Sequence, residues 1–292
     1  MFLIQKVEEV VVSYDDGRKT IGEFILSHPD TIHTYSIDEI ARQTHTSKAS
    51  IVRFAKTLGY EGWKDLKKDL LREKAHAQNA DGLDFNYPFH KGDDEATIAQ
   101  QIARVQQESI RDTMEHLDQP MLAQCTDLIL HAGKIVVFGI QPNTSVVQLF
   151  QRKMLSIGKS VEISDFREMG MSAKAMNSKD LAMIISYSGN NYSSEPMNTI
   201  PYLKENKVPI LAITSGGDNY LRMHTPYVLT LCSQERLYTK IANFSTEESL
   251  IYLLNVLFAC VFARNYDQNN DYKQRSARQI EPGRLKNIHI KE

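Results

Sequence analysis

The stretch Ser36–Gly59 reads SIDEIARQTHTSKASIVRFAKTLG and contains two helical patterns separated by a short polar turn. The first pattern begins with a capping box: the Ser36 hydroxyl can accept a hydrogen bond from the third helical amide, while Glu39 reaches back to the amide of Ser36. The turn is Thr44-His-Thr46. Two short helices joined in this way are typical of a helix-turn-helix, in which the second helix enters the DNA major groove.

The second helix of this stretch has two faces. It is predicted from about Ser47 to Leu58, with Thr46 or Ser47 as its cap and Gly59 in the left-handed position that ends a helix. Its apolar stripe, which must face the domain core, contains Ile51, Phe54, Ala55 and Leu58. The opposite face carries small and polar residues and then an arginine, which allows close approach to base edges and a hydrogen bond to guanine. The candidate DNA-binding residues are Thr46, Ser47, Lys48, Ser50, Arg53 and Lys56.

Basic residues gather around this helix although the whole chain is almost neutral, with a formal net charge of -2. Residues 42–72 contain eight lysines and arginines and only three acidic residues, a local excess of five positive charges. Such a surface attracts DNA phosphates and gives a salt-dependent affinity. The alternative is a plain helical domain with solvated lysines, and the charge pattern by itself does not separate the two interpretations.

Further helices flank this stretch on both sides. Apolar spacing around Ile21 and Phe24 predicts a preceding helix that Pro29 ends, and another helix is predicted to begin near Trp63. The segment that follows loses this periodicity and gains Gly, Asn, Asp and Pro, which indicates a linker. We therefore predict an all-α helix-turn-helix domain over residues 1–77, a linker over 78–95, a second domain over 96–265 and a polar tail over 266–292.

The second domain alternates short apolar runs with helical stretches. Four runs have the length and the β-branched content of buried strands, at residues 135–138, 181–185, 208–213 and 227–231. Strands that alternate with helices predict an α/β fold with a doubly wound parallel sheet of the flavodoxin-like type. In such a sheet, ligands bind beyond the carboxyl ends of the strands.

The loop Ser186–Asn191, which reads SYSGNN, follows the second of these runs. Hydroxyl groups, a glycine and free amides at the start of a helix can hold a phosphate group. An ordinary connecting loop of the same composition is the alternative. Thr214–Gly217 ends the next run and has two similar interpretations, a flexible turn or a ligand-facing edge.

The composition argues against several other classes of protein. With 42% hydrophobic and 24% charged residues, the chain has the composition of an ordinary globular protein. The three cysteines, Cys125, Cys232 and Cys260, have no CxxC spacing, and the nine histidines are scattered, so we expect no disulfide framework, no metal and no other cofactor. The N-terminus lacks the features of a signal peptide, and Asn255 interrupts the apolar run 250–263. We therefore expect a cytoplasmic protein without a membrane partner.

The segment from Ser36 to Lys67 closely resembles the N-terminal domain of the RpiR family of bacterial regulators, above all in Ser47-Lys-Ala-Ser-Ile-Val-Arg-Phe54 and Leu58-Gly-Tyr60. The similarity extends through the second domain to about Asn265, and in that family the second domain looks like a sugar isomerase (SIS) fold used as a sensor. The resemblance implies a regulator of genes for sugar-phosphate or amino-sugar-phosphate metabolism. The partners it implies are operator DNA, a phosphorylated sugar and further copies of the chain, in a homodimer or homotetramer.

The resemblance also implies a set of ligand residues. The loop that begins at Ser186 is similar to the SIS loop that binds the phosphate of the sugar, while Gln141 and Asn143 stand where the family more often has a glycine and a serine. Glu247 or Glu248 occupies the region of a glutamate that serves as the base in the enzymes of this fold, although acids in a first helical turn also simply favour the helix dipole. None of these residues is expected to be catalytic here. The implied ligand-binding residues are Gly139, Asn143, Ser186, Ser188, Gly189, Asn190, Asn191 and Glu247.

The sequence leaves three functions to compare. The first is a transcription regulator whose effector changes the placement of two recognition helices. The second is a sugar-phosphate isomerase or etherase with an accessory domain, although an isomerase has no need of the segment 36–58. The third is a ligand-binding scaffold that does not bind DNA. Two local alternatives accompany them: the helix over Leu250–Phe262 is a subunit interface or a core helix, and His224 is an acid or base or a structural residue.

Overall fold

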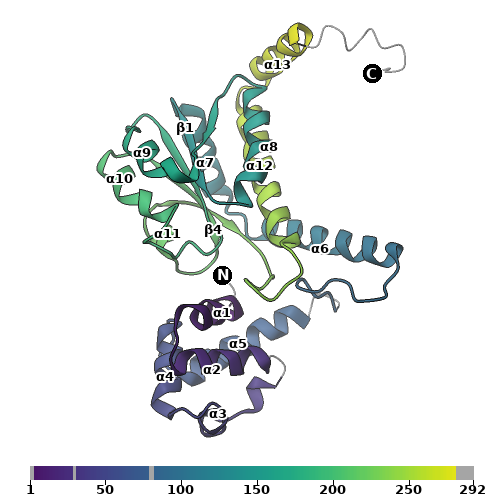
Figure 1. Ribbon diagram of the computed structural model, residues 1–292. Coiled ribbons are helices and arrows are strands. Elements are labelled where there is room, and N and C mark those ends of the chain that lie inside the picture. The colour runs from purple at the N-terminus through teal and green to yellow at the C-terminus, as the bar shows by residue number, and fades with distance from the viewer. Residues whose placement is uncertain (1–2, 29–30, 79–81, 281–292) are drawn as a thin grey trace. The chain divides into compact units, whose positions relative to one another are not determined.

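The computed structural model describes residues 3–28, 31–78 and 82–280 and contains two compact units (Figure 1). The first unit comprises residues 1–109 and 233–246, and the second comprises residues 110–232 and 247–292. The short segment 233–246 therefore packs with the helical first unit, although the chain on either side of it belongs to the second.

Helices form the N-terminal part of the first unit. They are α1 (Leu3–Ser13), α2 (Gly17–Ser27), the 3-10 helix η1 (Ile32–Thr34), α3 (Ile37–Gln43), α4 (Lys48–Thr57) and α5 (Trp63–Gln78). Burial of one large apolar side chain contributes about 1.5–3 kcal/mol, so packing rather than helix propensity stabilises helices as short as α3 and α4. The completely buried residues of this core include Ile21, Ile25, Ile40, Ile51, Phe54 and Leu66.

The predicted helix starts are confirmed. At α3 the Glu39 amide donates to Ser36 Oγ over 3.2 Å, and the Ser36 amide donates to Glu39 Oε2 over 2.7 Å, which completes the capping box. At α4 the cap is Ser47, whose Oγ accepts a 3.1 Å hydrogen bond from the Ser50 amide. These caps satisfy amides that the first helical turn leaves without a partner.

The first unit also differs from the prediction at its N-terminal end. Helix α1 precedes the predicted helices, and its apolar residues Leu3, Val7 and Val10 pack into the same core. Their spacing of three and four residues is typical of a helix, although no helix was predicted here. Helix α2 ends at Ser27, while Pro29, which we expected to end it, lies outside the described residues.

The second unit contains a five-stranded parallel sheet in the order β2-β1-β3-β4-β5. Its strands are β1 (Ile135–Gly139), β2 (Val161–Ile163), β3 (Leu181–Ile185), β4 (Ile210–Ser215) and β5 (Tyr227–Leu231). This order is the predicted doubly wound, flavodoxin-like arrangement, with its switch point between β1 and β3. Strand β2 was not predicted, because three residues are too few to show a strand pattern.

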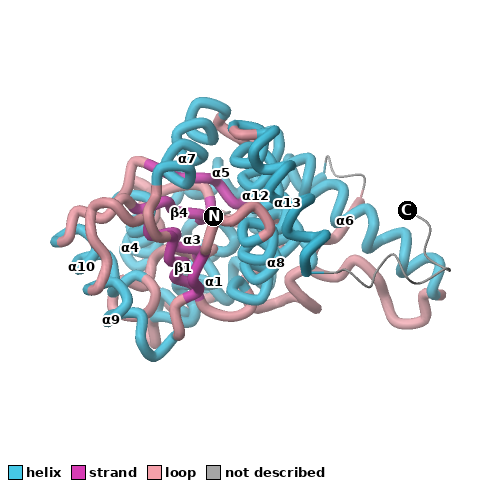
Figure 2. The backbone as a smooth tube through the Cα atoms, turned by 90° about the horizontal axis from the view of Figure 1, so that it is seen from above, coloured by secondary structure: helices cyan, strands magenta, loops and turns pink. Residues whose placement is uncertain are grey.

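Helices cover both faces of this sheet (Figure 2). On one face lie α7 (Gln119–His131), α8 (Asn143–Leu155) and α12 (Phe244–Arg264), and on the other lie α9 (Met169–Lys174), α10 (Ile200–Glu205) and α11 (Tyr220–Met223). The remaining helical elements are α6 (Glu95–Glu115), η2 (Phe166–Glu168), η3 (Met197–Thr199) and α13 (Tyr266–Ile280). Successive strand residues enter opposite cores, Val137 the first and Val136 the second, as the strand period of two requires.

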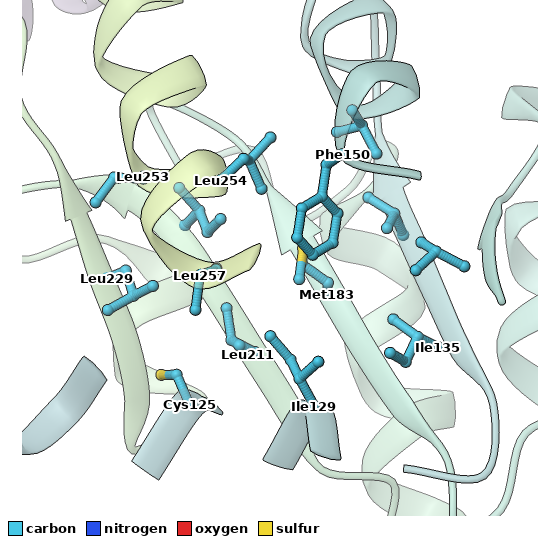
Figure 3. Packing of buried hydrophobic residues seen from close by; sticks show 14 of the residues in the cluster. Cys125, Ile129, Ile135, Phe150, Met183, Leu211, Leu229, Leu253, Leu254 and Leu257 are labelled. Atoms are coloured by element: carbon cyan, nitrogen blue, oxygen red, sulfur yellow. The ribbon is translucent and has the colours of Figure 1, made fainter. Parts of the chain in front are cut away.

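Helix α12 packs one side against the sheet. Figure 3 shows Leu253, Leu254 and Leu257 among strand residues such as Met183 and Leu211, and none of these side chains is more than 2% exposed. The helix spans 21 residues, so it is longer than the apolar run seen in the sequence, and among the described residues it is the one helix long and apolar enough to cross a membrane. Its packing on the strands supports the core-helix interpretation of Leu250–Phe262, and its role as a subunit interface stays a prediction.

The predicted polar tail starts with the helix α13. Within α13, Asn269 is buried and its side-chain amide donates to the Phe262 carbonyl oxygen over 3.0 Å. Tyr272 lies over Gly158, where an added Cβ would come within 2.9 Å of the tyrosine ring. Asn269 and Tyr272 therefore connect the start of the predicted tail to the second unit, while most side chains of α13 are exposed.

Candidate DNA-binding and effector-binding sites

The outer face of α4 lines a cavity of about 690 Å³. Ser50, Arg53 and Lys56, three of the predicted DNA-binding residues, share this wall because every third residue of a helix lies on nearly the same side. Thr57 of α4 and the start of α2, through Asp16, Gly17 and Arg18, supply the rest of the wall. The inner face of α4 is fixed in the core, so the orientation of the outer face follows from packing.

Hydroxyl groups organise the first turn of this face. Ser47 Oγ and Ser50 Oγ are 2.9 Å apart, and Arg53 Nη2 donates to Ser50 Oγ over 3.1 Å. The Arg53 side chain is nevertheless exposed, and a guanidinium carries five N–H donors in a planar fork. This arrangement suits a bidentate contact to the O6 and N7 atoms of guanine.

Thr46 and Lys48 do not line the cavity. Thr46 Oγ1 is 2.8 Å from Thr44 Oγ1 within the turn. Lys48 Nζ forms an ion pair with Asp38 Oδ1 at 2.5 Å, and the two side chains are 62% and 58% exposed. Such an exposed ion pair contributes about 0–1 kcal/mol, so the lysine can exchange its partner for a phosphate at little cost. The assignment of both residues to the DNA interface stays a prediction.

Asp16 and Arg18 were not among the predicted site residues. Asp16 caps α2 by accepting a 2.9 Å hydrogen bond from the Arg18 amide, and its carboxylate also binds the Arg18 guanidinium at 2.7 Å. An aspartate followed by glycine and arginine is a readable helix start. The spacing of residues does not reveal, however, that this helix start lies beside α4.

At the switch point of the sheet, β1 and β3 end side by side. Gly139 pairs with Ile185, and Ser186 follows directly. A Cβ on Gly139 would lie 3.3 Å from the Ile185 carbonyl oxygen, a tight contact that glycine avoids. Two of the predicted ligand residues, Gly139 and Ser186, are thus neighbours at the edge where doubly wound sheets bind ligands.

The loop Ser186–Asn191 begins with a tight turn. Gly189 has a φ of +64°, and its amide donates to Ser186 Oγ over 3.2 Å. A Cβ at this position would lie 2.6 Å from Asn219 Oδ1 and 2.7 Å from Thr214 Oγ1, in addition to the strain of the left-handed backbone. Glycine is therefore required here, and the hydroxyl-bearing residues Ser186 and Ser188 are half-buried beside it.

The chain that follows β4 braces this turn. The Leu221 amide donates to the Gly189 carbonyl oxygen over 2.9 Å, and the Tyr220 amide donates to Asn190 Oδ1 over 3.3 Å. The chain that leaves β4 through Thr214–Gly217 therefore helps to shape the loop Ser186–Asn191. Its direct contact with a ligand, one of the two interpretations of the sequence, stays a prediction.

The other predicted ligand residues are more widely spread. Asn143 is the first residue of α8. Asn191 is exposed, and its Oδ1 accepts a 3.1 Å hydrogen bond from Ser193 Oγ. Glu247 lies in the first turn of α12, which follows β5 in the chain, and β4 separates β5 from β3 in the sheet. The five residues gathered around the turn are Gly139, Ser186, Ser188, Gly189 and Asn190.

Two further side chains near this edge have structural partners. His224 Nδ1 lies 2.7 Å from the Tyr220 carbonyl oxygen, and the two rings are 4.0 Å apart, which supports the structural interpretation of this histidine. Arg222 was not selected from the sequence. Its Nη2 donates to the Ser215 carbonyl oxygen and to Thr230 Oγ1, and burial lowers its pKa. Over the part of the chain that the structure describes, no group of three or more His, Cys, Asp or Glu side chains is placed to hold a metal ion.

Two family models match the chain. A helix-turn-helix domain of the rpiR family matches residues 1–77, and a SIS domain matches residues 128–258. An HTH-type transcriptional regulator from Clostridium perfringens is 27% identical over 269 residues, which cover 92% of this chain and 95% of the relative. Another HTH-type transcriptional regulator, from Haemophilus influenzae, is 26% identical over 285 residues, which cover 97% of this chain and 98% of the relative.

Solved structures share the fold. The Vibrio vulnificus NanR protein complexed with ManNAc-6P has a TM-score of 0.60 at 20% identity, with 96% of this chain and 98% of that chain covered. The sugar isomerase domain of an RpiR transcription factor from Sphaerobacter thermophilus has a TM-score of 0.53 at 15% identity. The match covers 62% of this chain and 98% of that chain. At these identities the likeness establishes the fold of both parts of the chain.

Proposed function

We propose a specific function for this chain, which belongs to the RpiR family of helix-turn-helix transcription regulators with a SIS domain. Its DNA-binding domain, residues 1–77, binds operator DNA through α4, and its sensor domain, residues 96–265, binds a phosphorylated sugar at the loop Ser186–Asn191. The observation that carries the proposal is the exposed outer face of α4, on which Ser50, Arg53 and Lys56 gather.

The DNA contact follows from the chemistry of this face. Arg53 reads guanine, Lys56 binds phosphate, and the short side chain of Ser50 lets the helix approach the base edges. The caps Ser36 and Ser47 hold the two helices of the motif in place, because each satisfies an otherwise unpaired amide. Thr46, Ser47 and Lys48 add contacts at the start of α4.

The effector contact uses the turn at the switch point. The hydroxyls of Ser186 and Ser188 and the backbone around Gly189 hold the phosphate, and Asn143, Asn190, Asn191 and Glu247 contact the sugar. An amino-sugar phosphate is the class we propose, since the NanR protein, which shares the fold over both domains, is complexed with ManNAc-6P. The effector is sensed rather than converted, so the protein is a regulator and not an enzyme.

The regulator acts as a homodimer in the cytoplasm. Leu149 and Leu155 of α8 are 55% and 62% exposed, on the same side of the sheet as α12, where Phe258 and Phe262 are only partly buried. A second copy of the chain that covers these side chains would supply a second recognition helix, and half-sites for such dimers lie about 34–36 Å apart on DNA. The effector then changes the distance between the two helices and thereby the affinity for the operator.

A thermal-shift titration with ManNAc-6P and other phosphorylated sugars tests the effector site. A bound effector stabilises the protein by about 2.7 kcal/mol at a hundredfold excess over Kd. Ser188→Ala should abolish the shift, whereas Ser156→Ala, whose hydroxyl donates to the Lys153 carbonyl oxygen at the other end of α8, should keep it. Turnover of any of these sugars at ordinary enzymatic rates would contradict the regulator function.

Fluorescence anisotropy with a duplex from the region upstream of the chain's own gene tests the DNA site. Arg53→Ala should weaken binding by about 1–3 kcal/mol and reduce the preference over a random-sequence duplex. The control is Arg72→Ala, which removes an exposed arginine of α5 that pairs with Asp69 at 3.4 Å and does not line the cavity, so the preference for the upstream duplex should stay unchanged. An unchanged affinity and salt dependence for Arg53→Ala would rule out α4 as the recognition helix.

A further inference from the structure

A third positively charged side chain lines the cavity beside α4, and it belongs to a different helix. Arg18, in the first turn of α2, shares the wall with Arg53 and Lys56. Its side chain is 32% exposed, so the guanidinium is partly covered and partly open to solvent. Asp16 is the only acidic residue of this wall, which therefore carries three positive charges and one negative charge.

Two neighbours fix the orientation of this guanidinium. The Asp16 carboxylate accepts from Arg18 Nε at 3.0 and 3.1 Å and from Nη2 at 2.7 Å, which is a bidentate pairing. On another side, the guanidinium carbon lies 3.5 Å from the centre of the Tyr14 ring, a cation–π contact. A lysine could make neither contact with the same geometry, because its ammonium is a point charge without a plane.

This fixed geometry favours binding of an anion. The hydrogen bond to Asp16 raises the pKa of Arg18, and the hydrogen bonds from Arg18 lower the pKa of Asp16 to about 2. Both groups therefore stay charged at neutral pH. The arginine has already lost its rotamer freedom on folding, so an anion that binds the remaining N–H donors does not have to order the side chain.

We propose that Arg18, held by Asp16 and Tyr14, contacts a DNA backbone phosphate and fixes the angle at which α4 enters the major groove. This inference rests on the proposed function, since it assigns a second anchor to the same DNA site. With Arg18 on α2 and Arg53 on α4, the two contacts come from two helices of one rigid core, so the phosphate contact sets the register in which Arg53 meets a base.

The neighbouring residue of α2 provides a matched control. Lys19 also pairs with an aspartate, Asp15, at 3.1 Å, and its side chain is 43% exposed, but it does not line the cavity. The test is fluorescence anisotropy over a series of salt concentrations with the upstream duplex and a random-sequence duplex of the same length. Arg18→Ala should weaken binding of both duplexes about tenfold and lower the salt slope by about one, whereas Lys19→Ala should leave both quantities unchanged.

Asp16→Asn separates positioning from charge. Asparagine keeps the cap of α2 because it is an equally good N-cap residue, but it no longer holds the guanidinium by a charged fork. The proposal expects weaker binding of the upstream duplex by Asp16→Asn. If Arg18 acted only as a point charge, loss of the nearby negative charge would tighten binding of both duplexes, and that result overturns the proposed positioning.

The outcomes also distinguish this inference from the function on which it rests. Circular dichroism and thermal melting of each variant establish that the helical unit is folded. If Arg18→Ala binds both duplexes like the wild type while Arg53→Ala loses affinity, the Arg18 contact is wrong and the DNA-binding function stands. If the wild-type chain shows neither preference for the upstream duplex nor salt-dependent binding, both are wrong.

Discussion

The two candidate sites are built in different ways. The DNA-binding face takes Ser50, Arg53 and Lys56 from a single ten-residue helix and adds only the start of α2. The effector site takes Gly139 from the end of β1 and the turn at Ser186 from the end of β3, and the chain after β4 braces it. A site on one helix depends on local packing, whereas a site at a sheet edge depends on strand order and on close contacts between distant segments.

The largest effect in this comparison is expected from Phe54→Ala in the core of the helical unit. Phe54 is completely buried, and a phenylalanine-to-alanine change in a core costs about 3–5 kcal/mol. We expect loss of DNA binding in anisotropy but an unchanged thermal shift with the effector, because the sheet has its own core. Equal loss of both activities would show that the two sites do not depend on separate cores.

A smaller effect is expected from Gly189→Ala in the effector turn. The left-handed backbone costs an alanine about 1–3 kcal/mol, and the added Cβ must also displace Asn219 and Thr214. The variant should lose its thermal shift with the effector and keep its DNA affinity. Gly170→Ala in α9 is the control, since its Cβ would meet only Tyr202 at 3.9 Å.

Removal of a single helix cap should have a smaller effect still. Ser47→Ala deletes the acceptor of the Ser50 amide and should lower the free energy of unfolding of the helical unit by about 1 kcal/mol, measured by chemical denaturation. Thr57→Ala, at the other end of α4, removes a hydroxyl that donates to the Arg53 carbonyl oxygen and caps no helix start. It should change the stability less than Ser47→Ala does.

The smallest expected effect is a loss of stability of the second unit in alkaline solution, which is absent at neutral pH. Burial raises the pKa of Cys125 to about 12 and that of Cys232 to about 11, while an exposed thiol titrates near 8.5. The unfolded chain therefore releases these protons first, so the stability that the protonated thiols contribute is complete below about pH 8.5 and is lost as the pH rises toward 11–12. Only the second unit contains cysteines.

Chemical denaturation followed between pH 8 and pH 10 measures this alkaline loss. The double variant Cys125→Ala, Cys232→Ala should show a flatter decline in the stability of the second unit, because the two thiols no longer ionise on unfolding. The wild-type helical unit should show no thiol contribution. An identical decline in the double variant and the wild type would contradict the assigned cause.

The accuracy of the sequence predictions follows the same division between local and distant contacts. The capping box of Ser36 and the apolar stripe of α4 were predicted correctly, since both depend on residues within four positions of each other. Four of the five strands were also predicted, because each forms a continuous apolar run. Helix α1 was not predicted, although the spacing of Leu3, Val7 and Val10 is helical. Strand β2 was not predicted because its three residues are too few to show a strand pattern.

By itself, the sequence determined the two classes of fold, the helix starts, the exposed face of α4 and the position of the Ser-Gly loop after β3. Each of these features depends on the periodicity of side chains or on hydrogen bonds between residues close in sequence. Tertiary structure alone decided that Arg18 shares a wall with Arg53, that Gly189 fits against Asn219, and that β4 separates β5 from β3, the strand that leads into the loop Ser186–Asn191. These contacts join segments that are far apart in the chain, and only the packing of whole elements determines which of them meet.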